Sequence, residues 1–172
     1  MKHFYFHDDV YPSAECSTIR EAARMILTDS SGKLVFLKVE GEDLFGKRGH
    51  IETIGGGMEK GETPRQTLQR ECLEELGYEC EILDELCVIE DDYHLLHRHN
   101  IFYFYAGILK RKVAEPQLND IERSLRMHPC FLDIEKAYGI LDHPHPQRVE
   151  KLVYRRDRMA LKCWEIWRKH QK

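Results

Sequence analysis

Three glutamates near the middle of the chain have the spacing of a metal-binding helix face. Glu71, Glu74 and Glu75 stand at positions i, i+3 and i+4, so in a helix their carboxylates project from one side. Like charges this close repel one another. A hard cation relieves the repulsion, because Mg²⁺ takes carboxylate oxygens together with substrate phosphates and waters. Most acidic runs are simply solvated helix faces, so metal binding is one hypothesis that the spacing suggests.

The residues around the glutamates could position such a site. Arg70 lies four residues before Glu74 and can hold one carboxylate in place. Upstream, Gly55, Gly56 and Gly57 allow the backbone to pass close to the carboxylates without a Cβ in the way. The pattern therefore predicts a glycine-rich turn that enters the acidic helix.

Local signals predict that this helix begins after Thr63 and ends before Gly77. Thr63 is suited to the N-cap, Gln66 completes a T-x-x-Q capping box, and Pro64 suits the first helical position. Gly77 provides a left-handed C-terminal stop. Residues that recur every four positions form the expected buried stripe, with Leu73 beside it: Leu68, Cys72 and Leu76.

The rest of the chain alternates between strand and helix patterns. Apolar and β-branched runs predict strands over residues 24–28, 34–39, 50–54, 81–90, 100–109 and 131–132. Helical spacing predicts a turn over residues 135–141 and a longer amphipathic helix from about residue 147 to 169, and polar composition predicts loops over residues 41–49 and 111–120. The final helix is expected to bury Val149, Leu152, Val153, Ala160, Cys163 and Trp167. Strands mixed with two substantial helices indicate an α/β or α+β sandwich, and no linker or repeat divides residues 1–172, so one domain is expected.

Composition narrows the classes of function. The 172 residues are 42% hydrophobic and 33% charged, as in a soluble globular protein, and the net charge of −4 gives no case for binding nucleic acid. No run approaches the roughly 20 apolar residues of a membrane span. Residues 1–9 turn polar too early for a secretory signal. The six cysteines are scattered without a C-x-x-C pair, which favours reduced thiols in the cytoplasm.

The C-terminal end is basic, with an excess of Lys and Arg over residues 146–172. Three interpretations stay open: contact with a polyphosphate or an acidic partner, support of a dimer, or solubilisation of the outer face of the last helix. Because apolar residues repeat on the other side of that helix, the third interpretation is favoured.

The segment from Gly56 to Tyr78 resembles the Nudix box, a 23-residue signature written G-x5-E-x7-R-E-U-x-E-E-x-G-U, where U is a bulky apolar residue. All polar and glycine positions of the signature are met. Cys72 and Tyr78 are unusual choices at apolar positions, and Ile54 stands where many family members have proline. The order of elements over residues 20–140 also looks like a Nudix fold, an α/β/α sandwich around a mixed sheet.

The resemblance implies a role for each residue of the pattern. Glu71, Glu74 and Glu75 would bind Mg²⁺ or Mn²⁺, Arg70 would orient a carboxylate, and Glu62 would brace the loop against the helix. The implied activity is Mg²⁺-dependent cleavage of a diphosphate linkage in a nucleoside diphosphate joined to another moiety. Substrates of this class are nucleoside triphosphates, dinucleoside polyphosphates, nucleotide sugars and ADP-ribose. The cations neutralise phosphate oxygens and lower the pKa of bound water.

The general base varies within the family and is left open. One of the box glutamates can serve, or a carboxylate from a later loop, where Glu122 is the first choice before Asp120 and Glu115. An exposed loop charge explains Glu122 equally well.

A binding function is also compatible with the pattern. A catalytically silent, nucleotide-sensing module could share the fold, although no box glutamate is lost. A diphosphate isomerase would depart from the full box. The substrate is expected to be a small nucleotide-type molecule, without a nucleic-acid or membrane partner, and a homodimer would be in keeping with the family. Tyr93 is a candidate for base stacking, although packing is the more common role of such a residue. The group His94, His97 and His99 could contact phosphate or metal from a loop, but a polar hairpin tip is favoured.

Overall fold

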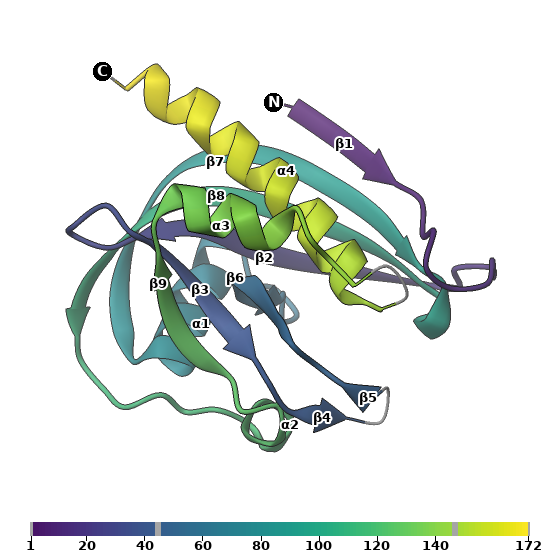
Figure 1. The fold of residues 1–172 in the computed structure, drawn as a ribbon. Coiled ribbons are helices and arrows are strands. Elements are labelled where there is room, and N and C mark those ends of the chain that lie inside the picture. Colours follow the sequence, from purple (N-terminus) through teal and green to yellow (C-terminus); the bar gives the residue numbers. More distant parts are fainter. Residues whose placement is uncertain (1, 44–45, 146–147, 172) are drawn as a thin grey trace.

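Seven strands of the computed structural model pair into one mixed sheet, which runs through the centre of the molecule (Figure 1). The structure describes residues 2–43, 46–145 and 148–171. The strands are β1 (Lys2–Phe6), β2 (Thr18–Thr28), β3 (Leu34–Val39), β6 (His50–Gly57), β7 (Tyr78–Tyr93), β8 (Arg98–Lys112) and β9 (His128–Leu132), and their order across the sheet is β1-β7-β8-β2-β6-β3-β9. The β1–β7 and β2–β8 pairs are parallel and the other pairs are antiparallel.

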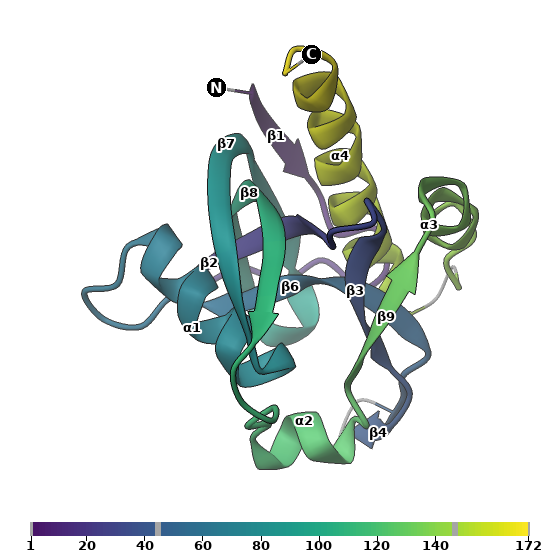
Figure 2. The ribbon, with the colours of Figure 1, turned by 90° about the vertical axis from the view of Figure 1, so that its left-hand side faces the viewer.

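Helices cover both faces of the sheet. Figure 2 shows α1 (Pro64–Leu76) on one side and α3 (Ile134–Leu141) and α4 (Glu150–Lys169) on the other. The short helix α2 (Asp120–Ser124), the 3-10 turn η1 (His94–Leu96) and the small hairpin of β4 (Glu42–Asp43) and β5 (Gly46–Lys47) lie at the ends of strands. None of the helices in the described ranges is long and apolar enough to cross a membrane. The predicted α/β/α sandwich around a mixed sheet is confirmed.

The alternation of side chains along β2 explains how one sheet supports two cores. Ala22 and Ile26 pack in the cluster under α4, whereas Met25 and Leu27 pack in the cluster under α1. Successive side chains of a strand point to opposite faces, so an unbroken apolar run is buried on both sides. The apolar sequence of β2 therefore requires a helical layer on each face.

The signals that delimit α1 act as predicted. The Thr63 side chain accepts a hydrogen bond from the backbone N–H of Gln66, which completes the capping box. Gly77 adopts φ 75°, and a Cβ there would lie 2.1 Å from the carbonyl oxygen of Ala114. Only glycine fits this position, because both the left-handed backbone and the close approach exclude a side chain. The expectation for Leu73 is not met, since its side chain is exposed.

Several boundaries differ from the predicted ones. β2, β7 and β8 are longer than their apolar runs, and β1 has no predicted counterpart. The expected loop over residues 41–49 contains the β4–β5 hairpin. The expected start of the last helix at residue 147 lies outside the described residues, and α4 begins at Glu150. Within α4, Trp164 is the buried tryptophan, while Trp167 is half-buried.

β1 is attached to the sheet by a network of histidines and carboxylates. His99 Nε2 lies 2.7 Å from Glu90 Oε2, and His99 Nδ1 lies 2.9 Å from Asp92 Oδ1. From β1, the Nε2 atom of His3 lies 2.5 Å from the other oxygen of Glu90, and the Tyr5 hydroxyl donates to Asp92. The three histidines of the predicted hairpin tip are thus divided, because His99 belongs to this network while His94 and His97 lie in the turn.

This network makes the stability of the fold depend on pH through His99. Burial lowers the pKa of His99, but the hydrogen bonds to Asp92 and Glu90 outweigh burial and raise the pKa above its usual value. A raised folded-state pKa adds stability that is complete below the unfolded value of about 6.5 and is lost as pH rises through the folded value. We expect the free energy of unfolding of the wild type, relative to a His99→Gln variant, to fall with pH across that window. Urea unfolding at several pH values measures it, and parallel curves for the two proteins would contradict the expectation.

Candidate active site

Arg70, in the middle of α1, holds three glutamates together. Its Nε donates to Glu62 Oε1 at 2.8 Å, and its Nη1 donates to Glu71 Oε1 at 2.8 Å and to Glu74 Oε2 at 3.0 Å. Its Nη2 donates to the carbonyl oxygen of Gly57 at 3.0 Å. The arginine therefore links the glycine-rich turn to the acidic face of the helix. Four of the residues singled out by their spacing are in direct contact.

Glu62 braces the loop that precedes the helix. Its Oε2 accepts hydrogen bonds from the Glu59 N–H at 2.9 Å and from the Thr67 hydroxyl at 2.7 Å. The hydrogen bond from Arg70, followed by the one from Glu59, lowers the pKa of Glu62 to about 2. The carboxylate is thus ionised, and it ties both ends of the loop to the first turns of α1.

Glu75 and Glu71 form the buried part of the acidic face. Their residues are 5% and 8% exposed, and Glu75 Oε2 accepts the Gly55 N–H at 3.1 Å. Burial, and after it the charge of Glu71, raises the pKa of Glu75 well above its usual value, and burial also raises the pKa of Glu71. A Cβ on Gly56 would lie 2.3 Å from Glu71 Oε1, so this position accepts only glycine without a shift of the carboxylate.

This donor set fits a hard divalent cation. Two adjacent carboxylates lie in a buried place where their own charges disfavour each other, and oxygen ligands of this kind are those that Mg²⁺ prefers. The glycine-rich turn leaves a cradle that a side chain would fill. No group of three acidic, histidine or cysteine side chains in the described ranges is already gathered as a set of metal ligands. The guanidinium of Arg70 instead contacts oxygens of Glu71 and Glu74.

The candidate bases of the later loop lie outside this cluster. Glu122 Oε2 accepts the Asn119 N–H at 2.8 Å, because the five-residue helix α2 uses the carboxylate in its own capping box. Asp120 pairs with Arg123 at 2.6 Å, and Glu115 pairs with Lys112 at 2.6 Å. Within the described chain, none of the three carboxylates has a hydrogen bond or an ion pair to the Arg70 cluster.

A second group of charged residues escaped the sequence analysis. A cavity of about 150 Å³ between the sheet and α4 is lined by four arginines, Arg20, Arg24, Arg98 and Arg156, together with Glu52, Asp91 and Asn100. Tyr93 also lines this cavity, and its residue is buried. One feature of the sequence pointed to this group. Arg24 is a charged residue in the middle of an apolar run of β2, and the residues on both sides of it are buried. The other members come from distant segments, so no spacing relates them.

The cavity adjoins the acidic face through two strands. Arg24 stands opposite Gly55 in the β2–β6 pairing, and the N–H of Gly55 is the donor to Glu75. Arg20 lines both the cavity and an open groove formed by residues 19–21 and 57–62. The acidic helix face and the arginine cluster are thus joined by the glycine-rich turn of β6.

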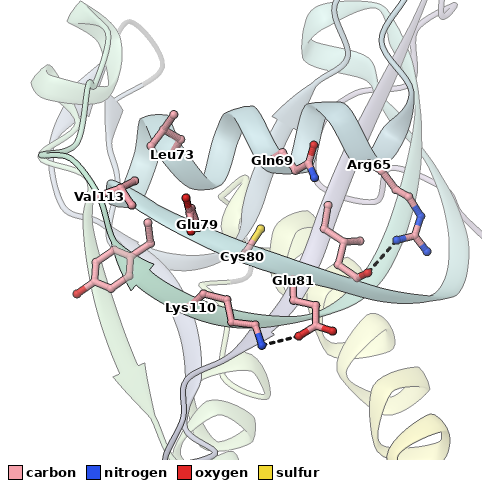
Figure 3. A pocket seen from close by; sticks show the side chains of 10 residues that line it. Arg65, Gln69, Leu73, Glu79, Cys80, Glu81, Lys110 and Val113 are labelled. Carbon is pink, nitrogen blue, oxygen red and sulfur yellow. Dashed lines mark hydrogen bonds and ion pairs between the residues drawn. The ribbon is translucent and has the colours of Figure 1, made fainter.

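Another hollow lies on the other edge of α1. Figure 3 shows Arg65, Gln69 and Leu73 of the helix above Cys80, Glu81 and Lys110 of β7 and β8. This hollow measures about 740 Å³, but none of the box glutamates lines it. Its walls have no buried charge cluster comparable with the acidic face, so we do not place the chemistry there.

Comparison with known proteins points to one family. A family model described as the NUDIX domain matches residues 18–155. The fold is similar to a NUDIX hydrolase from Nitrosomonas europaea, with a TM-score of 0.65 and 14% identity over 86% of this chain and 88% of that one. It is also similar to the MutT protein from Methanosarcina mazei Go1, with a TM-score of 0.59 and 13% identity over 90% of this chain and 97% of that one.

Two further structures have names that state a substrate. One is an ADP compounds hydrolase, with a TM-score of 0.60 and 15% identity over 88% of this chain and 74% of that one. The second is a UDP-X diphosphatase, with a TM-score of 0.57 and 17% identity over 94% of this chain and 68% of that one. At these identities the likeness shows the fold alone. No curated protein matches the sequence.

Proposed function

The chain belongs to the Nudix family of hydrolases, and on that premise we propose that it is a Mg²⁺-dependent enzyme that cleaves a diphosphate linkage in a nucleoside diphosphate joined to another moiety. The observation that carries the proposal is the Arg70 cluster. One guanidinium of α1 contacts Glu62 of the preceding loop and Glu71 and Glu74 of the helix. The remaining glutamate of the box, Glu75, is buried against the glycine-rich turn.

The metal would be held by Glu71, Glu74 and Glu75. When bound, Mg²⁺ or Mn²⁺ would neutralise the diphosphate oxygens and lower the pKa of an attacking water. The chain supplies the positions of the ligands: Arg70 sets Glu71 and Glu74 side by side, and the Gly55 N–H holds Glu75.

We propose that a box glutamate acts as the general base. Glu74 is the most exposed of the three, with 43% of its side chain accessible, so it can reach a water on the open side of the helix. A base role for Glu122 would first require its carboxylate to release the Asn119 N–H. Glu122 therefore stays the second candidate.

The substrate class is a proposal that rests on two supports. The family acts on diphosphates that are linked to another group, and the names of two similar structures include an ADP compound and a UDP-linked compound. A small-molecule nucleotide also suits an acidic protein with a net charge of −4, which has no general attraction for nucleic acid. The competing function is that of a silent nucleotide sensor, but all the glutamates of the box are present.

A substrate panel tests the proposal directly. The purified protein is incubated with nucleoside triphosphates, nucleotide sugars, ADP-ribose and dinucleoside polyphosphates in the presence of Mg²⁺ or Mn²⁺, and products are separated by ion-exchange chromatography. We expect hydrolysis of at least one compound and loss of that hydrolysis in EDTA. If none is cleaved while a nucleotide still raises the melting temperature, a sensor function replaces the enzymatic one.

A further inference from the structure

The arginine-lined cavity contains buried polar atoms that have no partner. Arg24 and Arg156 are 6% and 5% exposed, and Asn100 is 2% exposed. In the described chain, Arg24 Nε, Arg98 Nε, Arg156 Nη2 and Asn100 Oδ1 are buried without a hydrogen bond. Buried polar groups in native proteins almost always have a partner, and each exception calls for an explanation. All four atoms belong to residues that line one cavity.

The residues that line the cavity carry more positive than negative charge. Of the two carboxylates on its wall, Glu52 lies 3.3 Å from Arg24 Nη2 and 3.9 Å from Arg156 Nη2. Asp91 accepts the side-chain N–H of Asn100 at 2.7 Å. Neither Arg20 nor Arg98 has an ion pair among the residues that the structure describes. Burial, and after it the nearby charges of Arg24, Arg98 and Arg156, lowers the pKa of Arg20 to about 10.

A purely structural ion-pair network explains only part of this arrangement. Arg156 is held by Asp157, whose Oδ1 accepts the Arg156 Nε–H at 2.7 Å, and Arg24 donates to the carbonyl oxygen of Thr53 at 2.5 Å. These contacts account for two arginines. Within the described ranges they leave Arg20 and Arg98 without an ion pair, although both residues are half-buried beside other guanidinium groups.

The unpaired atoms define the chemistry of the ligand. Three of them are guanidinium donors, which select an acceptor-rich anion, and arginine is the side chain best suited to phosphate oxygens. The fourth, Asn100 Oδ1, is an acceptor because the amide nitrogen already donates to Asp91. It would accept from a hydroxyl on or beside the phosphate. The cavity volume of about 150 Å³ leaves room for a phosphate group.

We propose that this cavity binds a phosphate group of the substrate that is not part of the scissile diphosphate. The inference rests on the proposed function for its link to catalysis, since Arg20 and Arg24 connect the cavity to the turn that supports Glu71 and Glu75. A substrate with a diphosphate at the acidic face and a second phosphate in the cavity satisfies both sites. The enzyme would therefore prefer a nucleotide that carries a separate phosphate monoester over one whose remaining part is uncharged.

The first test uses inorganic phosphate in EDTA, which removes divalent metal and so isolates the cavity from the acidic face. Isothermal titration calorimetry measures affinity, and ¹H–¹⁵N spectra of the arginine Nε–H groups report where the phosphate lies. We expect saturable binding, shifts of the Arg24 and Arg98 Nε–H signals, and affinity at least roughly tenfold lower in Arg98→Gln and in Arg20→Gln. Arg158→Gln is the matched control, because Arg158 lies on α4 but pairs with Asp142 outside the cavity.

Equal phosphate affinity in the wild type, the cavity variants and the control would overturn the proposal, and so would binding too weak to saturate. Two half-buried arginines are substituted separately so that the failure of one variant to fold leaves the other. The second test compares kcat/KM for paired substrates that differ only in one phosphate monoester. We expect Arg98→Gln to lower kcat/KM on the phosphorylated member at least roughly tenfold more than on the other member, whereas equal losses on both would overturn the proposal.

The two tests separate this inference from the proposed function. If phosphate binds in the cavity but the protein has no hydrolytic activity, the phosphate site is supported and the proposed enzymatic function is contradicted. If the protein shows metal-dependent hydrolysis but both cavity variants bind phosphate as the wild type does, the enzymatic function is supported and the phosphate site is contradicted.

Discussion

Replacing Glu75 with glutamine is expected to lower kcat/KM by roughly 10²- to 10⁴-fold, because a metal ligand that stabilises transition-state charge contributes several kcal/mol and each 1.4 kcal/mol is a factor of ten. The substitution is nearly isosteric. The amide oxygen of glutamine can still accept the Gly55 N–H, which Glu75 accepts at 3.1 Å, so the turn should keep its shape. What is lost is one negative charge beside Glu71, and with it the attraction for a divalent cation.

Activity on the substrate identified by the panel is measured together with melting temperature, with and without Mg²⁺. The wild type should gain stability from Mg²⁺ by mass action, and Glu75→Gln should gain much less. Without metal the variant should be no less stable than the wild type, since glutamine carries no charge into a site that is 5% exposed. Glu79→Gln is the control, because it removes only an exposed pair with Arg111. Wild-type turnover by Glu75→Gln would exclude Glu75 from the metal site.

Replacing Asp157 with alanine is expected to destabilise the fold by about 3–5 kcal/mol, the usual cost of removing one partner of a buried ion pair. Asp157 is fully buried on α4, where it accepts the Arg156 Nε–H at 2.7 Å and the Thr53 N–H at 2.8 Å. Without it, the nearest carboxylate oxygen to the buried Arg156 is the one of Glu52 at 3.9 Å. The backbone N–H of Thr53 would also lose its acceptor.

Urea unfolding at neutral pH measures this effect, with the midpoint expected to fall at an unchanged m-value. For a chain of this length the loss corresponds to a fall of roughly 10 °C in Tm. Asp133→Ala serves as the comparison, because Asp133 is exposed and reaches Lys136 only at 3.9 Å. It should change the free energy of unfolding by no more than about 0.5 kcal/mol. A loss below about 1 kcal/mol in Asp157→Ala would mean that Asp157 does not anchor α4 to the sheet.

The basic C-terminal segment shows how a composition argument can be right and still incomplete. The excess of Lys and Arg over residues 146–172 favoured a solvated helix face, and α4 is indeed amphipathic, with Lys162 exposed. Arg156 is instead buried, with its guanidinium 4.6 Å from the centroid of the Phe102 ring. Arg156 stands three residues after Val153 and four before Ala160, on the side of α4 that packs on the sheet. Asp157, next to it in the sequence, supplies the counter-ion that makes burial tolerable.

The acidic face could be predicted from the sequence because everything that forms it is local. Helical geometry puts Glu71, Glu74 and Glu75 on one side, and the caps at Thr63 and Gly77 depend on residues within one turn. The core of each long strand was also readable, since β3 and the middle of β2 and β8 are apolar runs. These features need no knowledge of which segments meet in space.

Only the tertiary structure decided what lies around the acidic face. The arginine cavity combines β2, β8 and α4, and it exists because β2 pairs in parallel with β8 while α4 crosses the same face. β1 is likewise a strand only because it pairs with the distant β7, where Lys2 stands opposite Cys87. Side-chain spacing determines contacts within one element, where the backbone geometry is known in advance. Contacts between distant elements follow from the packing of the whole chain, so the candidate metal ligands could be proposed from the sequence and the arginine cavity beside them could not.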